Sequence, residues 1–157
     1  MIFRDMKNNV LDNNSLRSCT SCGICASVCG TNAISLEHDS DGFYRPVIND
    51  AKCVECGLCK KYCYKYDNEF KLADTALASY AAWNNDADQL ARSSSGGMSR
   101  LLMEECIDRG YKVFGCTYDL ASNKAKSIVV GSVDDLDQFY GSKYFQSYTP
   151  EAFVEIL

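Results

Sequence analysis

The chain has 157 residues, ten cysteines and a formal net charge of −5. Acidic and basic residues are interspersed, so the sequence lacks the basic patch that binds a phosphate backbone, and we expect no nucleic-acid partner. No stretch approaches the roughly 18 apolar residues of a membrane span, and the N-terminus lacks the apolar segment of a signal peptide. These features indicate a chain without a membrane span, placed in a reducing cytoplasm and long enough for one or two domains.

Eight of the ten cysteines lie between Cys19 and Cys63, in two copies of the pattern C-x2-C-x2-C-x3-C. Each cysteine of the first copy recurs 34 residues later in the second copy. Three thiolates at every third residue of a tight loop can bind three corners of one cubane cluster, whereas the fourth lies too far along the chain. The repeat therefore predicts two 4Fe-4S clusters.

The spacing resembles that of bacterial-type two-cluster ferredoxins, in which the fourth cysteine of each copy ligates the other cluster. The resemblance implies two crosswise ligand sets, which are Cys19, Cys22, Cys25 and Cys63 for the first cluster, and Cys53, Cys56, Cys59 and Cys29 for the second. The proline that usually follows the fourth cysteine is replaced by Gly30 in one copy and Tyr64 in the other. This departure concerns the start of the local helix and the cluster potential, not the ligation.

Two other interpretations compete with the clusters. A disulfide framework is typical of small secreted chains, but cysteines at every third residue are poor partners for bridging separated loops. Two zinc ions could also occupy eight thiolates, although zinc sites usually place a longer loop between two C-x2-C pairs. The immediate third and fourth cysteines favour iron-sulfur clusters over zinc.

The first 18 residues are polar and rich in asparagine, and we assign them no role. Between the cysteine copies, the alternation in residues 33–37 and 43–48 predicts a β-hairpin around a polar turn. His38, the only histidine, lies next to this turn and is expected on the surface. The polar and aromatic stretch at residues 64–69 is the expected boundary between a cluster domain, residues 1–70, and a second domain, residues 71–157.

In the second domain, residues 77–83 are expected to form a strand, and a helix should begin at Met98 and stop at Gly110. The apolar face of this helix consists of Met98, Leu101, Leu102, Cys106 and Ile107.

Residues 112–118 and 126–130 are expected to form two further strands, joined by a turn at residues 122–123. A strand, a helix and a strand in succession predict a right-handed crossover and a parallel pair of strands. Cys106 and Cys116 fall inside these elements and are expected to be small buried apolar residues, not ligands.

Two motifs in this domain could bind an anion. Residues 93–97 precede the helix at Met98, and free backbone N–H groups at a helix start favour a phosphate, although an ordinary serine cap explains the same residues. Residues 141–147 form a polar loop with one lysine, Lys143, after a short helical stretch at residues 134–139.

Together with the cysteine repeat and residues 80–84, these motifs resemble the beta-subunit family of deazaflavin-coenzyme-dependent hydrogenases and dehydrogenases. The resemblance extends from Cys19 to the C-terminus. It implies iron-sulfur clusters, a flavin (FAD or FMN), and hydrogenase or dehydrogenase subunits or another redox protein as partners. The implied flavin-binding residues are Ser94, Ser95, Gly96, Gly97, Ser142, Lys143, Tyr144, Gln146 and Ser147.

At the C-terminus, Thr149 and Pro150 are typical of a helix start, yet residues 151–157 give fewer than two turns, too few for a stable isolated helix. The family normally continues into a further large domain, so the resemblance also implies C-terminal truncation. The sequence thus predicts an α+β chain in which a two-cluster ferredoxin-like domain precedes a small, incomplete α/β domain. The expected function is an iron-sulfur oxidoreductase subunit that relays single electrons to or from a flavin, and the alternative is a non-catalytic electron-transfer module.

Overall fold

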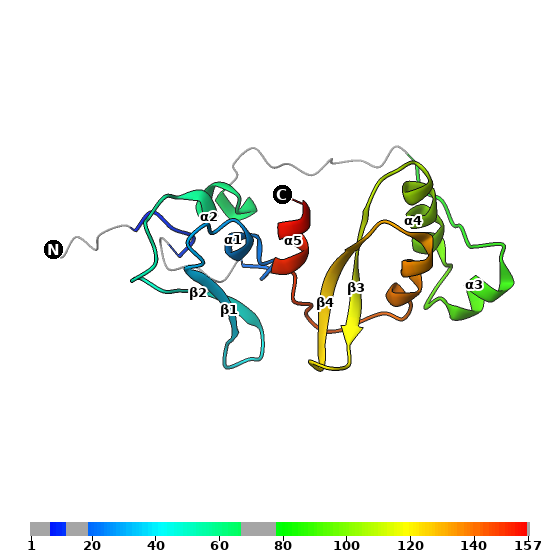
Figure 1. Cartoon of the computed structure of the whole chain (residues 1–157). Helices are drawn as coiled ribbons and strands as arrows, with labels where there is room; N and C mark the ends of the chain where they lie inside the picture. The colour runs from blue at the N-terminus through cyan, green and yellow to red at the C-terminus, as the bar shows by residue number, and fades with distance from the viewer. Residues whose placement is uncertain (1–6, 12–18, 67–77, 157) are drawn as a thin grey trace. The chain divides into compact units, whose positions relative to one another are not determined.

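A computed structural model describes residues 7–11, 19–66 and 78–156, and these residues divide into two compact units. The first unit contains the described residues from Lys7 to Tyr66 together with the C-terminal segment Tyr148–Glu155, and the second extends from Ala78 to Ser147. The segment Tyr148–Glu155 therefore belongs to the same compact unit as the cysteine repeat. Figure 1 shows the elements of each unit.

The first unit combines short helices with one two-stranded sheet. Its elements are α1 (Ile24–Ser27), β1 (Ile34–His38), β2 (Tyr44–Ile48), α2 (Leu58–Lys61), the 3-10 helix η2 (Tyr64–Tyr66) and α5 (Pro150–Ile156). The strands pair antiparallel, with Ile34 opposite Ile48 and His38 opposite Tyr44, which confirms the predicted hairpin. His38 is exposed as expected, and its ring stacks on that of Tyr44 with centroids 4.3 Å apart.

Cysteine side chains form much of the core of the first unit. Its buried cluster consists of Val10, Cys25, Ile34, Cys59 and Cys63, with partly buried residues such as Tyr66 packed against it. A core with so few large aliphatic side chains gains little from burial of apolar surface alone. The thiols and whatever they bind must therefore contribute much of the stability of this unit.

Lys7–Leu11, part of the segment to which the sequence assigned no role, belongs to this core. Val10 is 5% exposed and Asn9 is 2% exposed, and the Asn8 side-chain amide donates a hydrogen bond to the Glu55 carbonyl oxygen. The rest of the first 18 residues, which are residues 1–6 and 12–18, lies outside the described residues.

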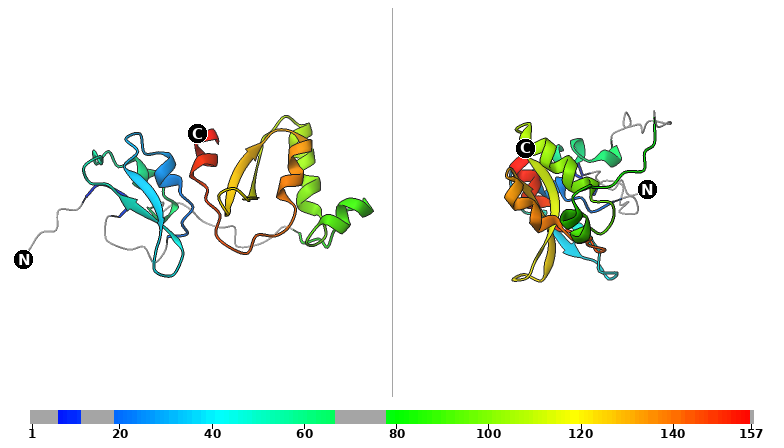
Figure 2. Two further views of the ribbon diagram at one scale, coloured as in Figure 1. Left: turned by 60° about the horizontal axis from the view of Figure 1, so that its bottom comes forward. Right: turned by 90° about the vertical axis from the view of Figure 1, so that its right-hand side faces the viewer.

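The second unit is a β-hairpin covered by helices. Its elements are α3 (Ala87–Arg92), α4 (Met98–Asp108), β3 (Val113–Asp119), β4 (Lys124–Val130) and the 3-10 helix η3 (Val133–Phe139). Helices α4 and η3 pack on each other and on β3, as the two views in Figure 2 show. Val113, Val130 and Leu136 form the buried core, and the Phe139 ring packs over Gly115.

Three predictions for this unit are wrong. Residues 78–83 form no strand, so the predicted crossover and parallel pair are absent from the described residues. Instead, β3 and β4 pair antiparallel, because the turn between them is too short for a crossover connection. The alanines of residues 78–83 also supply few β-branched side chains for a third strand.

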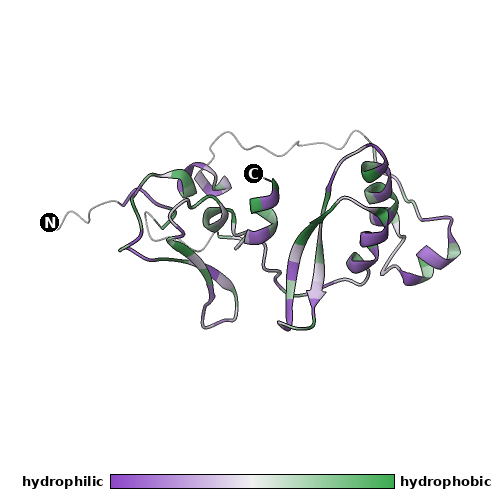
Figure 3. Ribbon diagram, in the orientation of Figure 1, coloured by the Kyte–Doolittle hydropathy of each residue, from purple (hydrophilic) through white to green (hydrophobic). Residues whose placement is uncertain are grey.

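The third wrong prediction concerns the apolar face of helix α4. The extent of this helix is confirmed, but two residues of the predicted apolar face are exposed. Leu102 is 61% exposed and Cys106 is exposed, whereas Met103 and Ile107 pack against the core. Figure 3 shows hydrophilic and hydrophobic residues alternating around α4. The second non-ligand cysteine, Cys116, is half-buried in β3. Among the described residues, no helix has the length and apolar character that crossing a membrane requires.

Candidate metal centres

The two cysteine copies have the same backbone conformation. Ser21 and Glu55, at equivalent positions, have positive φ angles of 59° and 52°, and Gly23 and Gly57 have φ angles of 81° and 76°. The short helices α1 and α2 begin immediately after the two glycines. Left-handed residues that alternate with right-handed ones turn successive N–H groups toward one side of a loop, a concave arrangement found at many iron-sulfur sites. The repeat in sequence is thus a repeat in structure.

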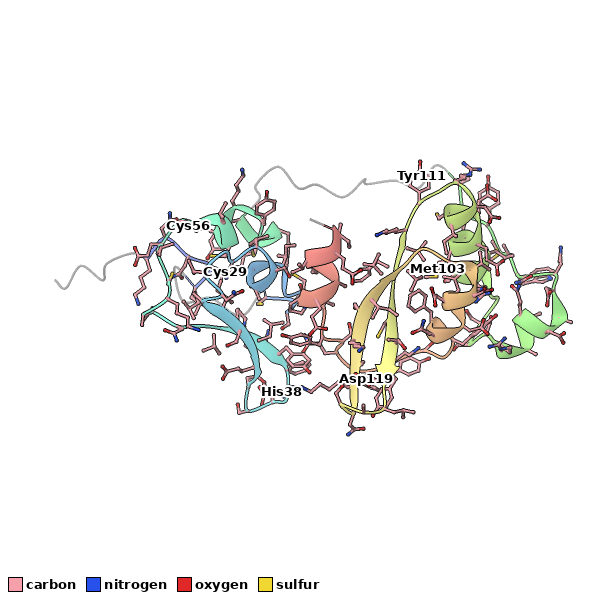
Figure 4. All side chains as sticks on the ribbon, viewed as in Figure 1. Cys29, His38, Cys56, Met103, Tyr111 and Asp119 are labelled. Atoms are coloured by element: carbon pink, nitrogen blue, oxygen red, sulfur yellow. The ribbon has the colours of Figure 1, made fainter. Side chains whose placement is uncertain are left out.

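A cavity of about 220 Å³ lies at the second cysteine loop. Its lining includes Cys53, Cys56 and Cys59 of the second copy and also Cys29, the fourth cysteine of the first copy. Figure 4 labels Cys29 and Cys56 in the first unit. The structure therefore brings together the four thiols that the ferredoxin resemblance groups into one ligand set.

The thiol of Cys25 lies at the centre of the other group of cysteines. Burial first, and then the nearby thiolates of Cys22, Cys19, Cys59 and Cys63, together raise the pKa of this thiol to about 12. Cys59 and Cys63 belong to the second copy, so the Cys25 thiol interacts with cysteines of both copies.

Backbone N–H groups are aimed at cysteine sulfurs in this unit. The Ser21 N–H donates to Cys19 Sγ over 3.4 Å, and the Ala33 N–H donates to Cys29 Sγ over 3.2 Å. Burial acts to raise the pKa of Cys29, but hydrogen bonds from Thr31 and from backbone N–H groups lower it overall. Such donors stabilise thiolate charge, which any metal bound by these sulfurs requires.

The thiols do not converge on a single point. In the parts of the chain that the structure describes, no three histidine, cysteine, aspartate or glutamate side chains are close enough to hold one metal ion. In a 4Fe-4S cluster each thiolate binds a different iron, so four ligands surround a space wider than a single ion. The cavity with its four cysteines fits such a cluster.

Arg45 on β2 fixes the first cysteine loop. Its guanidinium donates to the Cys19 carbonyl oxygen over 2.9 Å and to Ser21 Oγ over 3.4 Å, while Asp39 holds its Nε at 2.9 Å. The ion pair with Asp39, followed by the smaller influence of Cys19, raises the pKa of Arg45. At the second loop the Asn8 amide donates to the Glu55 carbonyl oxygen, and Lys7, which pairs with Asp50, lies close to Glu55 and Cys53. The two loops are therefore held by different side chains although they share one backbone conformation.

We expect Arg45→Gln to make the reduction potential of the cluster at the first cysteine loop more negative by about 50 mV. This shift is roughly a tenfold change in a one-electron equilibrium. A positive charge next to a cluster stabilises the reduced form, and its removal withdraws that stabilisation. Arg45→Lys, which keeps the charge, should shift the potential less. Redox titration followed by electron paramagnetic resonance measures both clusters, and equal shifts in both clusters would contradict the local charge effect.

A second cavity, of about 180 Å³, lies within the second unit at the start of α4. Both motifs that the sequence suggested as candidate anion sites contribute to it, through Ser94, Ser95, Gly97 and Ser142. The Ser142 N–H also donates to Ser94 Oγ over 3.1 Å. The remaining lining includes Arg100, Met103, Leu136 and Tyr140. The structure therefore joins two motifs that are more than 40 residues apart in sequence.

Other residues of the predicted flavin set do not line this cavity. The Lys143 ammonium donates to the carbonyl oxygens of Phe139 and Tyr140, and the Tyr144 side chain is 91% exposed. Ser147 exchanges a hydrogen bond with Ser127. Gly96 and Gln146 are also outside the lining.

Sequence reasoning missed several residues around the cysteines, notably Asn8, Arg45 and Thr149. Arg45 carried a usable signal, because a lone cation in a hairpin next to a thiolate-rich loop is a candidate for pairing. Asn8 and Thr149 carried none, since their contacts are made across 47 and 127 residues of chain.

Comparison with protein families supports the geometry of the first unit. Residues 18–65 match the family model described as a 4Fe-4S dicluster domain. No curated protein matches the chain. This part of the chain is a ferredoxin-like 4Fe-4S dicluster domain, which serves iron-sulfur electron transfer.

Proposed function

We propose that this chain carries two 4Fe-4S clusters and relays single electrons between a redox partner and a flavin bound to the second unit. The observation that carries the electron-transfer part is the cavity in which Cys29 joins Cys53, Cys56 and Cys59. When bound, each cluster accepts and releases one electron at a time. The reducing cytoplasm is the proposed location, because it keeps ligand thiols available.

The proposed ligand sets are crosswise. The cavity that Cys29 shares with Cys53, Cys56 and Cys59 supports the second set, and the interaction of Cys63 with Cys25 supports the first set. Cys25, Cys59 and Cys63 are each no more than 9% exposed, so the protein shields much of both sites from water. Shielding and hydrogen bonds to sulfur are the means by which a protein adjusts cluster potentials.

Residues of the N-terminal segment and η2 pack against the buried cysteines. The Tyr66 hydroxyl donates to the Val10 carbonyl oxygen over 3.0 Å, which ties the two segments together beside the buried cysteines. In this proposal they exclude water and hold the thiols in place.

The proposed flavin site is the cavity at the start of α4, and the resemblance to deazaflavin-coenzyme beta subunits motivates it. The cavity combines the N-terminus of an 11-residue helix with serine hydroxyls, which suit the phosphate of FMN or FAD. Arg100 adds little net charge, because Glu104 and Asp137 neutralise its guanidinium at 2.6 Å and 2.9 Å. We therefore propose that serine hydroxyls and backbone amides, with Ser142 among them, contact the phosphate.

The flavin proposal predicts that Ser99→Glu weakens FMN or FAD binding by about tenfold or more. Ser99 lies in the first turn of α4 and lines the cavity, and a carboxylate there suits the helix dipole but repels a phosphate. Ser40→Glu, an equal change at an exposed turn of the first unit, is the control. Flavin titration followed by fluorescence measures the affinity. Equal affinity in both variants, or no saturable binding, would favour the alternative of a non-catalytic electron-transfer module.

Anaerobic purification with iron, sulfide, zinc and flavin measured on one sample tests the whole proposal. We expect about eight iron and eight sulfide per chain, together with flavin. Stoichiometric zinc without sulfide would show that the cysteines bind zinc and not iron-sulfur clusters.

A further inference from the structure

The two cysteine loops share one backbone conformation but differ in exposure. Ser21 is 4% exposed while its equivalent Glu55 is exposed, and Cys22 is half-buried while its equivalent Cys56 is exposed. The next apolar position follows the same trend, because Leu58 is 41% exposed and Ile24 is half-buried. The second loop is therefore the more accessible of the two.

The first loop is covered by the C-terminal segment of its own unit. The Thr149 hydroxyl donates to the Cys22 carbonyl oxygen, and Ser27 Oγ donates to the Pro150 carbonyl oxygen over 2.8 Å. A Cβ atom at Gly23 would lie 2.9 Å from Pro150 Cγ, so no space separates the segment from the loop. At the second loop a Cβ atom at the corresponding glycine, Gly57, would lie 2.7 Å from the Asn8 side-chain amide, so the described cover of that glycine comes from the segment Lys7–Leu11.

Exposed apolar residues and lysines occur together in the second loop and in the elements that follow it. Val54, Leu58 and Tyr62 are 67%, 41% and 48% exposed, and Figure 4 shows Cys56 next to α2. In residues 52–66, lysines outnumber acidic residues, although the chain as a whole is acidic. The charged residues from 52 to 66 are Lys52, Glu55, Lys60, Lys61 and Lys65.

From this asymmetry we propose that the second loop is the docking surface for a redox protein with an apolar contact point ringed by acidic residues. The inference rests on the proposed electron-transfer function. The partner carries a one-electron centre, and one electron passes between that centre and the dicluster domain with no bond made or broken. Charges separated by more than about 8 Å are largely screened at physiological salt, so the local lysines outweigh the net charge of the chain at contact distance.

Electron transfer to an acidic haem protein tests the proposal. The holo-protein is reduced anaerobically with dithionite, freed of excess reductant and mixed with oxidised cytochrome b5, whose reduction is followed by absorbance. The test variant is Lys52→Glu/Lys61→Glu, which reverses two exposed charges at the second loop. The control is Lys112→Glu/Lys124→Glu, which changes net charge equally at exposed positions of the second unit. We expect the test variant to react about tenfold more slowly than the control at low salt, with the difference shrinking as salt is added.

Each other outcome overturns the proposal. Equal rates in the two variants, with iron and sulfide contents unchanged, would exclude this surface while leaving the electron-transfer function intact. No reduction of cytochrome b5 by the unmodified protein, with no cluster iron, would overturn the function itself. If the test variant instead shifts the chain from dimer to monomer at an unchanged rate, the surface joins two copies of this chain.

Discussion

Cys56→Ala/Cys63→Ala should abolish both clusters, whereas Cys22→Ala/Cys63→Ala should abolish only one. In the crosswise arrangement Cys63 belongs to the same set as Cys22, so the second pair of substitutions damages one site twice. Cys56 belongs to the other set, so the first pair damages both sites. Iron analysis should find about four iron per chain in the Cys22 double variant and almost none in the Cys56 double variant.

The complementary pairs with Cys29 provide the control. Cys29→Ala/Cys56→Ala should retain about four iron per chain, and Cys29→Ala/Cys22→Ala should retain almost none. Both series remove two thiols, so a general loss of stability would lower all four values alike. The reverse pattern, in which the Cys22/Cys63 pair loses both clusters, would show that each copy ligates its own cluster.

The local structure of the first unit could be predicted because local sequence patterns determine it. The hairpin followed from alternation around a polar turn, and the dicluster domain from cysteine spacing. What could not be predicted was the environment of each loop, because Asn8, Arg45 and Thr149 reach the cysteines from distant parts of the chain. These contacts depend on tertiary packing, to which local patterns are insensitive.

The second unit was predicted less well, for a different reason. The extents of α4, β3 and β4 followed from periodicity, but the predicted parallel pair required a strand at residues 77–83, and residues 78–83 form none. The four residues from Leu120 to Asn123 permit only a hairpin. The apolar residues of α4 also exceed what a two-stranded sheet can cover, so Leu102 stays exposed.

Of the predicted flavin residues, those at the helix start and Ser142 meet at one cavity, whereas Lys143 does not. The family resemblance implied a flavin contact for this lysine. In the structure its ammonium donates hydrogen bonds to carbonyl oxygens at the end of η3. The sequence motif did not predict these hydrogen bonds.

Removal of iron by an anaerobic chelator should unfold the first unit and leave the second folded. Three of the five buried residues in the first core are cysteines, so the free energy of cluster binding is a large part of the folding free energy there. The second unit has its own core of Val113, Val130 and Leu136, with no ligand cysteine in it. Hydrogen exchange measured by mass spectrometry should show loss of amide protection in β1 and β2 and unchanged protection in β3 and β4. The second hairpin serves as the control within the same molecule.

Helix α5 makes this prediction sharper, because it is joined in sequence to the second unit but packs on the first. Seven residues are too few for a stable isolated helix, so α5 should depend on the contacts of Thr149 and Pro150 with Cys22 and Ser27. Its amides should therefore lose protection together with β1 and β2 when iron is removed. Protection of α5 that persists in the iron-free protein would mean that this segment is stabilised elsewhere. In that case the C-terminal segment would not be the element that covers the first cluster loop and distinguishes it from the second loop.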